Sequence, residues 1–351
     1  MVSSAISSAQ SIGMHLANDC CERSESSKCC LRARIWSSIC GLELFLTSVS
    51  GRSSPLLSRV VSKETIHSTE QHNHLPITIA NGNSGLEDPF LGFARINLYP
   101  YIVSIDAILY EVIQVLYDTD AAQLGQHETR RQTELLNDSL DKWHFEISSS
   151  AFDLDSPDQT PLPEQTYVKL RYFSTRMMIN RHCLHSLTSN SEVLVQPELS
   201  ISPDQRGAIL CVEAARAVIG LLPTNTDGRW LFQCTPFWCV LYYVVQSAGI
   251  LSLAVGSTAI HTPGPVFEII DDARNALRWL SEIANTGKPA QRAWFTISQL
   301  LLLALSEIDH DSEELEPFIP DELVFADDIP MKDFYVADLI TPLPPPVFLD
   351  K

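Results

Sequence analysis

Apolar residues recur along this chain at intervals of three and four, which is the period of an α-helix with one buried face. Residues 270–284 follow this pattern, and so do residues 105–116, 170–187 and 293–308. Alternation of strands with helices and hairpin signals between apolar runs do not occur. The sequence therefore predicts an all-α fold, an irregular array of about ten amphipathic helices around a central apolar helix.

The central helix is predicted from a segment without charge. Residues 230–267 contain no Asp, Glu, Lys or Arg, and the apolar core of this segment is residues 237–255. Roughly 20 apolar residues can cross a bilayer, but Gln246, Ser247 and Gly249 interrupt this run and no basic flank lies close to it. These features favour a helix buried among other helices over a membrane span. Farther on, the break at Gly287-Lys288-Pro289 predicts an antiparallel pair of helices.

Acidic residues are concentrated at the carboxyl end. The chain has a net charge of −19, and residues 307–351 hold 13 Asp and Glu against 2 Lys and Arg. The negative net charge of the whole chain repels phosphate backbones and argues against direct nucleic-acid binding. Phe318, Phe325 and Phe334 alternate with acids and prolines in this tail. We predict a helical domain over residues 1–306 and a mostly disordered acidic-aromatic tail, which is either an activation segment or a solvating one. We also expect proteases to cut this tail before they cut the preceding helix.

Motifs of common catalytic sites do not occur in the sequence. Gly-x-Ser-x-Gly, the phosphate-binding Gly-x4-Gly-Lys-Ser/Thr, Gly-x-Gly-x-x-Gly and His-Glu-x-x-His are all missing. We therefore expect a protein that is not an enzyme and has no cofactor of its own. A metabolic or membrane enzyme remains an alternative.

Two groups of cysteine and histidine are candidates for metal or nucleophile sites. Cys20-Cys21 and Cys29-Cys30 lack the knuckle spacing of zinc ligands, so we predict ordinary reduced thiols. In Arg181-His182-Cys183-Leu184-His185 a thiol and an imidazole could act as nucleophile and base. Neighbouring positions on a helix point apart, so we predict helix-end residues that face solvent or a carbonyl group.

Several motifs stand in a recognisable order near the amino terminus. Gly13 and His15 close one helix, and Arg32, Arg34 and Trp36 open the next. Glu43 follows seven residues after Trp36, and Gly51-Arg52 comes eight residues after Glu43. This pattern resembles the regulatory middle region of fungal binuclear zinc-cluster transcription factors. Ser37, Leu44 and Ser53 depart from the family's residues at their positions.

Later segments are similar to the same region. The helix that ends Asn180-Arg181-His182 resembles the family's His-Arg-Pro helix, and Cys211, Ala214, Ala215 and Ile219 resemble its Cys-x-x-Ala-Ala-x3-Ile helix. The family's six-cysteine zinc cluster, Cys-x2-Cys-x6-Cys, has no counterpart in this sequence. The resemblance thus implies a regulatory domain that is truncated at its amino terminus, with zinc and DNA contacts belonging to a domain outside it.

The resemblance implies a nuclear transcription regulator that acts through protein contacts. Expected partners are a coactivator and a second copy or a related regulator, with DNA reached only indirectly and no membrane. An alternative is a small-molecule-binding module or an interfering dimerisation module without DNA contact. We expect Arg34 and Arg52 to pair with Glu43 and join consecutive helices, and Trp36 to anchor that corner. We also expect the helix at residues 3–16 to expose an apolar patch and cause association.

Overall fold

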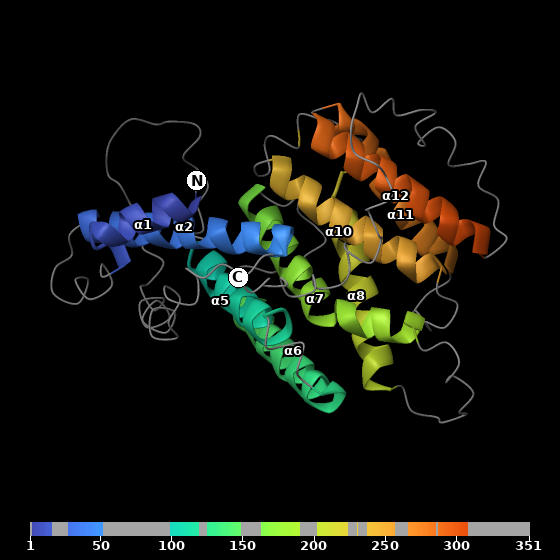
Figure 1. The fold of residues 1–351 in the computed structure, drawn as a ribbon, viewed down its shortest axis with the longest axis horizontal. Helices are drawn as coiled ribbons and strands as arrows, with labels where there is room; N and C mark the ends of the chain where they lie inside the picture. The colour runs from blue at the N-terminus through green and yellow to red at the C-terminus, as the bar shows by residue number, and fades with distance from the viewer. Residues whose placement is uncertain are drawn as a thin grey trace, which may run out of the picture. The chain divides into compact units, whose positions relative to one another are not determined.

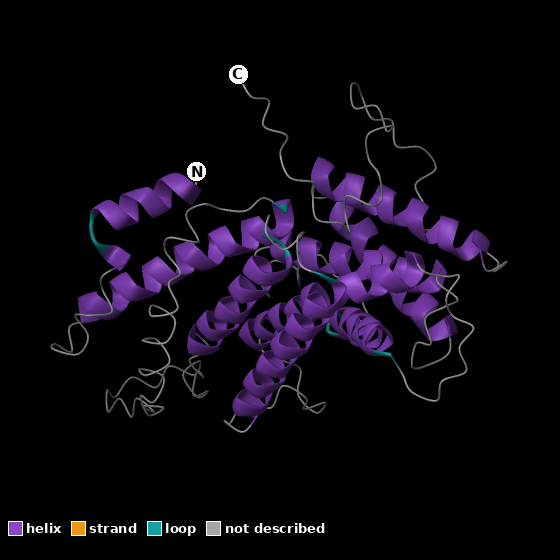
Figure 2. Cartoon of the chain, turned by 60° about the horizontal axis from the view of Figure 1, so that its bottom comes forward, coloured by secondary structure: helices purple, strands orange, loops and turns teal. Residues whose placement is uncertain are grey.

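The computed structural model describes residues 2–15, 27–51, 99–118, 125–148, 163–189, 202–223, 230, 237–256, 266–285 and 287–307. Within these ranges every regular element is a helix (Figures 1 and 2), which confirms the predicted all-α class. The chain divides into two compact units, residues 1–113 and residues 114–351. The predicted tail lies outside the described residues, and the predicted boundary at residue 306 therefore stays a prediction.

The first unit contains helices α1 (Val2–Ser11) and α2 (Ser27–Ser50) and most of α5 (Tyr99–Leu116). Helix α1 packs against α2, and Ile6, Ala9 and Trp36 form a small core between them. A Cβ atom at Gly41 of α2 would lie 2.6 Å from Oδ2 of Asp106, so the side chain of Asp106 on α5 reaches the backbone of α2 at this glycine. Helix α2 therefore contacts its neighbours along two parts of its surface.

The second unit contains six helices in its described residues. These are α6 (Gln126–Ser148), α7 (Pro163–Ser189), α8 (Pro203–Gly220), α10 (Phe237–Gly256), α11 (Val266–Ala284) and α12 (Lys288–Glu307). Helix α7 packs on α6, α8 and α10, while α11 and α12 pack on each other and on α10 (Figure 1). The break at Gly287 does separate the two helices predicted there.

Helix α10 is the apolar helix that the charge-free segment predicted. It contacts α7, α8, α11 and α12. Val240, Val244, Ala248 and Leu251 are fully buried along it. Residues 238–256 are long and apolar enough to cross a membrane, but 61% of the apolar window is covered by the protein itself. A buried core helix passes the same length test, so this packing supports the core assignment.

Two helices differ from the sequence-based expectation. Helix α6 was not predicted, although Thr133, Leu136, Leu140, Trp143 and Ile147 are buried at intervals of three and four residues. Helix α2 begins five residues before Arg32, where we expected it to start. Helix α1 ends at Ser11 because Gly13 has a φ of 69°, a left-handed conformation that glycine adopts easily.

Candidate functional site

The corner between α1 and α2 brings together four of the residues that carry the family resemblance. The Gly13 N–H donates to the Gln10 carbonyl at 2.9 Å and ends α1. His15 then lies against Trp36 with ring centroids 5.9 Å apart. Arg32 donates through Nη2 to the carbonyl of Ile12 at 2.6 Å, and Trp36 is 3% exposed. Trp36 is thus packed into this corner, while its role as an anchor stays a prediction.

The remaining residues of that motif have other positions. Glu43 is buried in α2, while Arg34 is exposed on the same helix. Nine residues of helix separate them, about 13.5 Å, so a pair between them would lie within one helix and could not join consecutive helices. Gly51, with a φ of 63°, ends α2 through a bond from its N–H to the Thr47 carbonyl at 3.0 Å. Arg52 lies outside the described residues.

In the second unit, a row of side-chain contacts joins α6 to α7 and to the start of α8. We call this row the polar ladder. Its four rungs are Arg130–Asp204, Thr133–His182, Asn137–Asn180 and Asp141–Arg176. The α6 members ascend in number while the α7 members descend, so the two helices run antiparallel and the ladder fixes their register.

Two rungs of the polar ladder, Asn137–Asn180 and Asp141–Arg176, make several hydrogen bonds each. Asn137 donates to Oδ1 of Asn180 at 2.9 Å, and Asn180 donates back to Oδ1 of Asn137 at 3.0 Å. Asn180 is completely buried and also donates to the Arg176 carbonyl. Arg176 donates to Asp141 and, at 2.6 Å, to the hydroxyl of Tyr172. Because these buried groups have partners, their desolvation is offset and they specify which surfaces of α6 and α7 meet.

Three arginines of α7 each lie over a tyrosine ring. Arg171 is 5.6 Å from the ring centroid of Tyr167, and Arg176 is 5.3 Å from that of Tyr172. The third pair is Arg181 with Tyr117, described next. Such contacts hold a cation in an apolar setting at a gain of about 0.5–2 kcal/mol.

Arg181, which also belongs to the family resemblance, makes the closest of these contacts. Its guanidinium lies 4.2 Å from the ring centroid of Tyr117 and donates through Nε to the Tyr117 hydroxyl at 2.9 Å. That hydroxyl in turn donates to the Met178 carbonyl. Burial raises the pKa of Tyr117, and the charge of Arg181 opposes this shift. Arg181 therefore ties the chain after α5 to α7 and acts as a packing residue.

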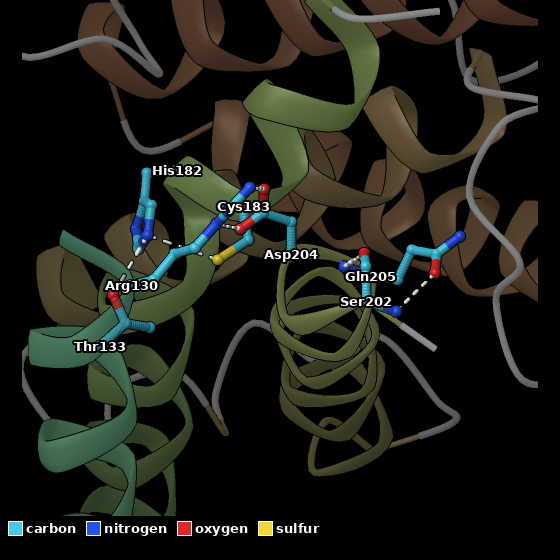
Figure 3. A network of polar contacts seen from close by, with 7 residues as sticks. All are labelled: Arg130, Thr133, His182, Cys183, Ser202, Asp204 and Gln205. Atoms are coloured by element: carbon cyan, nitrogen blue, oxygen red, sulfur yellow. Dashed lines mark hydrogen bonds and ion pairs between the residues drawn. The ribbon is translucent and has the colours of Figure 1, made fainter. Parts of the chain in front are cut away.

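The polar ladder begins with the rungs Arg130–Asp204 and Thr133–His182. This end contains Cys183 and His182, the possible catalytic pair named in the sequence analysis (Figure 3). The expectation that these side chains point apart is wrong here, whereas the expected contact of a histidine with a backbone group is found between His182 and Ile179. α7 continues to Ser189, Cys183 is 3% exposed, and its Sγ lies 3.3 Å from Nε2 of His182. The same Nε2 is 3.1 Å from the Thr133 hydroxyl, because α6 and α8 enclose this part of α7. His185 is the exposed member of the group.

The electrostatics of this pair oppose nucleophilic chemistry. Burial raises the pKa of Cys183 to about 12, and the nearby carboxylate of Asp204 contributes to this rise. Burial lowers the pKa of His182. At neutral pH the thiol thus keeps its proton, whereas a reactive cysteine needs a lowered pKa. The contact is a buried polar contact and not an activated nucleophile.

Asp204 connects this end to the start of α8. Arg130 holds both of its carboxylate oxygens, at 2.9 Å and 2.5 Å. Beside it, Ser202 accepts from the backbone N–H of Gln205 at 3.1 Å, and the Gln205 side chain accepts from the N–H of Ser202 at 2.8 Å (Figure 3). This capping box fixes the residue at which α8 begins.

Metal binding is the other chemistry that cysteines and histidines could support. In the ranges that the structure describes, no three His, Cys, Asp or Glu side chains are placed to hold an ion. Cys20 and Cys21 lie outside those ranges, and the side chains of Cys29 and Cys30 are not described. The expectation of ordinary thiols there stays a prediction.

The polar ladder itself was missed from the sequence. Arg130, Thr133, Asn137 and Asp141 do recur at intervals of three and four on one face of α6, and that signal could have found their side of it. Their partners lie between 35 and 74 residues away along the chain, and only the packing of the three helices brings them into reach.

Comparison with known proteins gives one informative match. No family model matches the chain, and no solved structure matches it. The chain is similar to a protein of Aspergillus niger named transcription regulator galc, with 24% identity over 330 residues. The alignment covers 75% of this chain but only 39% of that relative. This likeness supports a chain of the fungal transcription-factor type, while the correspondence to the middle region of such factors stays a prediction.

Proposed function

We propose that this chain is a transcription regulator of the fungal zinc-cluster type that works in the nucleus through protein–protein contacts. The observation that carries the proposal is the similarity to the Aspergillus niger regulator over three quarters of the chain. The all-helical described region and the protonated thiol of Cys183 are compatible with a non-enzymatic role.

In this proposal the helical domain is the regulatory part and the acidic tail is the activating part. Residues 307–351 have a net charge of −11, since 13 acidic residues stand against 2 basic ones, and aromatic residues lie among the acids. This composition suits amphipathic contacts with a coactivator. DNA would be reached only indirectly, and zinc would belong to a separate DNA-binding domain of the family's type. A small-molecule ligand of the helical domain is the alternative function, since helical packing can leave an apolar pocket.

A tethering experiment tests this division of roles. Residues 307–351, residues 1–306 and the whole chain are each fused to an unrelated DNA-binding domain, and a reporter is measured in a fungal host. We expect the tail to activate alone, the helical part not to activate, and the whole chain to activate less than the tail. A tail in which Phe318, Phe325 and Phe334 are changed to Ala keeps all its charge and should lose most activation. If neither the tail nor the whole chain activates, the activating role is wrong.

An interfering dimerisation module is the alternative that a specific observation favours. Helix α2 exposes a row of apolar side chains, which is the subject of the next subsection. In the same reporter host, such a module would lower transcription driven by a full-length related regulator without any fusion. Equal reporter levels with and without the chain would argue against it.

A further inference from the structure

The expected apolar patch lies on a different helix from the one predicted. Ile6 and Ala9 of α1 are buried against Trp36, and Ile12, directly after α1, is 59% exposed, so the described part of residues 3–16 shows a single large exposed apolar side chain and not a patch. Five large apolar side chains of α2 are instead between 37% and 58% exposed. They are Leu31, Ile35, Leu42, Leu46 and Val49, and we call them the α2 stripe.

The α2 stripe forms one continuous face. Its members are separated by four, seven, four and three residues, the spacing of one side of a helix that packs against another helix. From Leu31 to Val49 the stripe is about 27 Å long at about 1.5 Å per residue. Trp36, Leu44 and Thr47 are buried on other sides of the same helix. Helix α2 is thus apolar both toward its own unit and toward solvent.

We infer that the α2 stripe binds the α2 stripe of a second copy of this chain, with the two helices antiparallel. The first argument is the pairing of the two ends of the stripe when one helix is reversed, although Leu42 near the middle then lies opposite Ser38 and not opposite another member of the stripe. In an antiparallel pair centred near residue 40, Leu31 lies opposite Val49 and Ile35 lies opposite Leu46. Large side chains therefore meet large side chains at both ends, as a twofold interface between identical surfaces requires.

The second argument is the distribution of charge along α2. Its three basic residues, Lys28, Arg32 and Arg34, all lie in the first eight positions, and its one acidic residue is Glu43. A parallel pair would place the two basic ends together. An antiparallel pair places each basic end beside the uncharged carboxyl end of the other helix, where the last carbonyl groups carry partial negative charge. The helix is also net positive in a chain of −19, so this surface escapes the general repulsion between copies.

A charge-exchange series on the full chain tests both the surface and the orientation. Mass is measured by light scattering after gel filtration, over a range of protein concentrations. The wild type should have the mass of two chains. Ile35→Lys and Leu46→Glu should each weaken the dimer by roughly tenfold or more, because a charge would be buried against an apolar partner. The double variant I35K/L46E should restore the dimer, since the introduced lysine of one copy would then face the introduced glutamate of the other.

Leu135→Glu is the matched control, because Leu135 is 48% exposed on α6 and lies outside the α2 stripe. It should leave the dimer intact, and circular dichroism should show that all variants keep their helix content. A wild type that is monomeric at every concentration would overturn the inference. So would a dimer that survives both single changes. Singles that dissociate without rescue in the double variant would exclude the antiparallel pairing.

This inference does not depend on the proposed function. The dimer is measured without DNA or reporter, whereas the tethering experiment reads activation by the tail. A monomeric chain whose tail still activates the reporter would contradict only the dimer. A dimeric chain whose tail does not activate would contradict only the proposed function.

Discussion

Gly207 of α8 faces side chains of α7, and no larger residue fits there without movement. A Cβ atom at this position would be 2.5 Å from Sγ of Cys183 and 3.2 Å from Oδ1 of Asn180. Asn180 is held by the polar ladder and cannot yield easily. Overpacking usually costs about 1–3 kcal/mol, and alanine gains roughly 1 kcal/mol over glycine in helix propensity. We therefore expect Gly207→Ala to destabilise the protein by up to about 2 kcal/mol. The free energy of unfolding from urea titration measures this.

Gly220 on the same helix provides the control. No atom lies within 4 Å of the position of its Cβ. Gly220→Ala should therefore be neutral or stabilise by up to about 1 kcal/mol. If both glycine variants changed stability in the same direction and amount, close packing at Gly207 would not be the cause.

His182 should make the stability of the second unit depend on pH. Burial is the main cause that lowers its pKa below the ordinary 6.5, and the charge of Arg181 lowers it further while Asp204 opposes both. Below pH 6.5 the unfolded chain takes up a proton on this residue that the folded chain does not. The contribution of His182 to stability is therefore lost as the pH falls through the unfolded pKa toward the lower folded pKa.

Unfolding in urea at about pH 7.5 and about pH 5.5 tests this dependence, with His182→Gln and His185→Gln as the variants. The wild type should lose stability between the two pH values, and His182→Gln should lose less. His185 is exposed, so His185→Gln should follow the wild type. Identical losses in all three proteins would show that other groups set the dependence.

At the scale of single helices, the capping box is the clearest local determinant. The Ser202 hydroxyl accepts from the backbone N–H of Gln205 in the first turn of α8, and the Gln205 side chain accepts from the backbone N–H of Ser202. Ser202→Ala should cost about 1 kcal/mol, the typical effect of losing an N-cap. Ser139→Ala on the exposed side of α6 should be close to neutral, since alanine favours a helix interior. Thermal unfolding of both variants compares them, and equal shifts would contradict a capping role.

The helices were predictable where apolar spacing was strong and uninterrupted. Residues 105–116, 170–187 and 270–284 each carried such a stripe, and each lies in a helix. Helix α6 was missed because its apolar residues are spread among charged ones, although Leu136, Leu140 and Trp143 keep the helical period. The start of α8 was missed because Ser202 and Gln205 were not recognised as a capping box. Partners from other helices, such as Thr133 for His182, follow only from tertiary packing.

For the whole molecule, burial of α10 predicts how the chain divides between water and detergent. Its apolar side chains are covered by α7, α8, α11 and α12, so little of this surface is left for lipid or detergent. We expect the full chain to stay in the aqueous phase when a detergent solution is warmed to phase separation. Recovery in the detergent phase would favour the membrane alternative. A tagged soluble protein and a known membrane protein serve as controls.

The polar ladder has a consequence for how this part of the chain tolerates change. Replacing Asn137 or Asp141 removes one rung and leaves the others aligned. Deleting one residue between Arg130 and Asp141 turns every following rung by about 100° around α6 and shifts it by about 1.5 Å. All the later hydrogen bonds would then be lost at once, together with the apolar face that Leu140 and Trp143 share. We therefore expect this helix to accept substitutions far more readily than insertions or deletions, so that its length would be inherited more strictly than its composition.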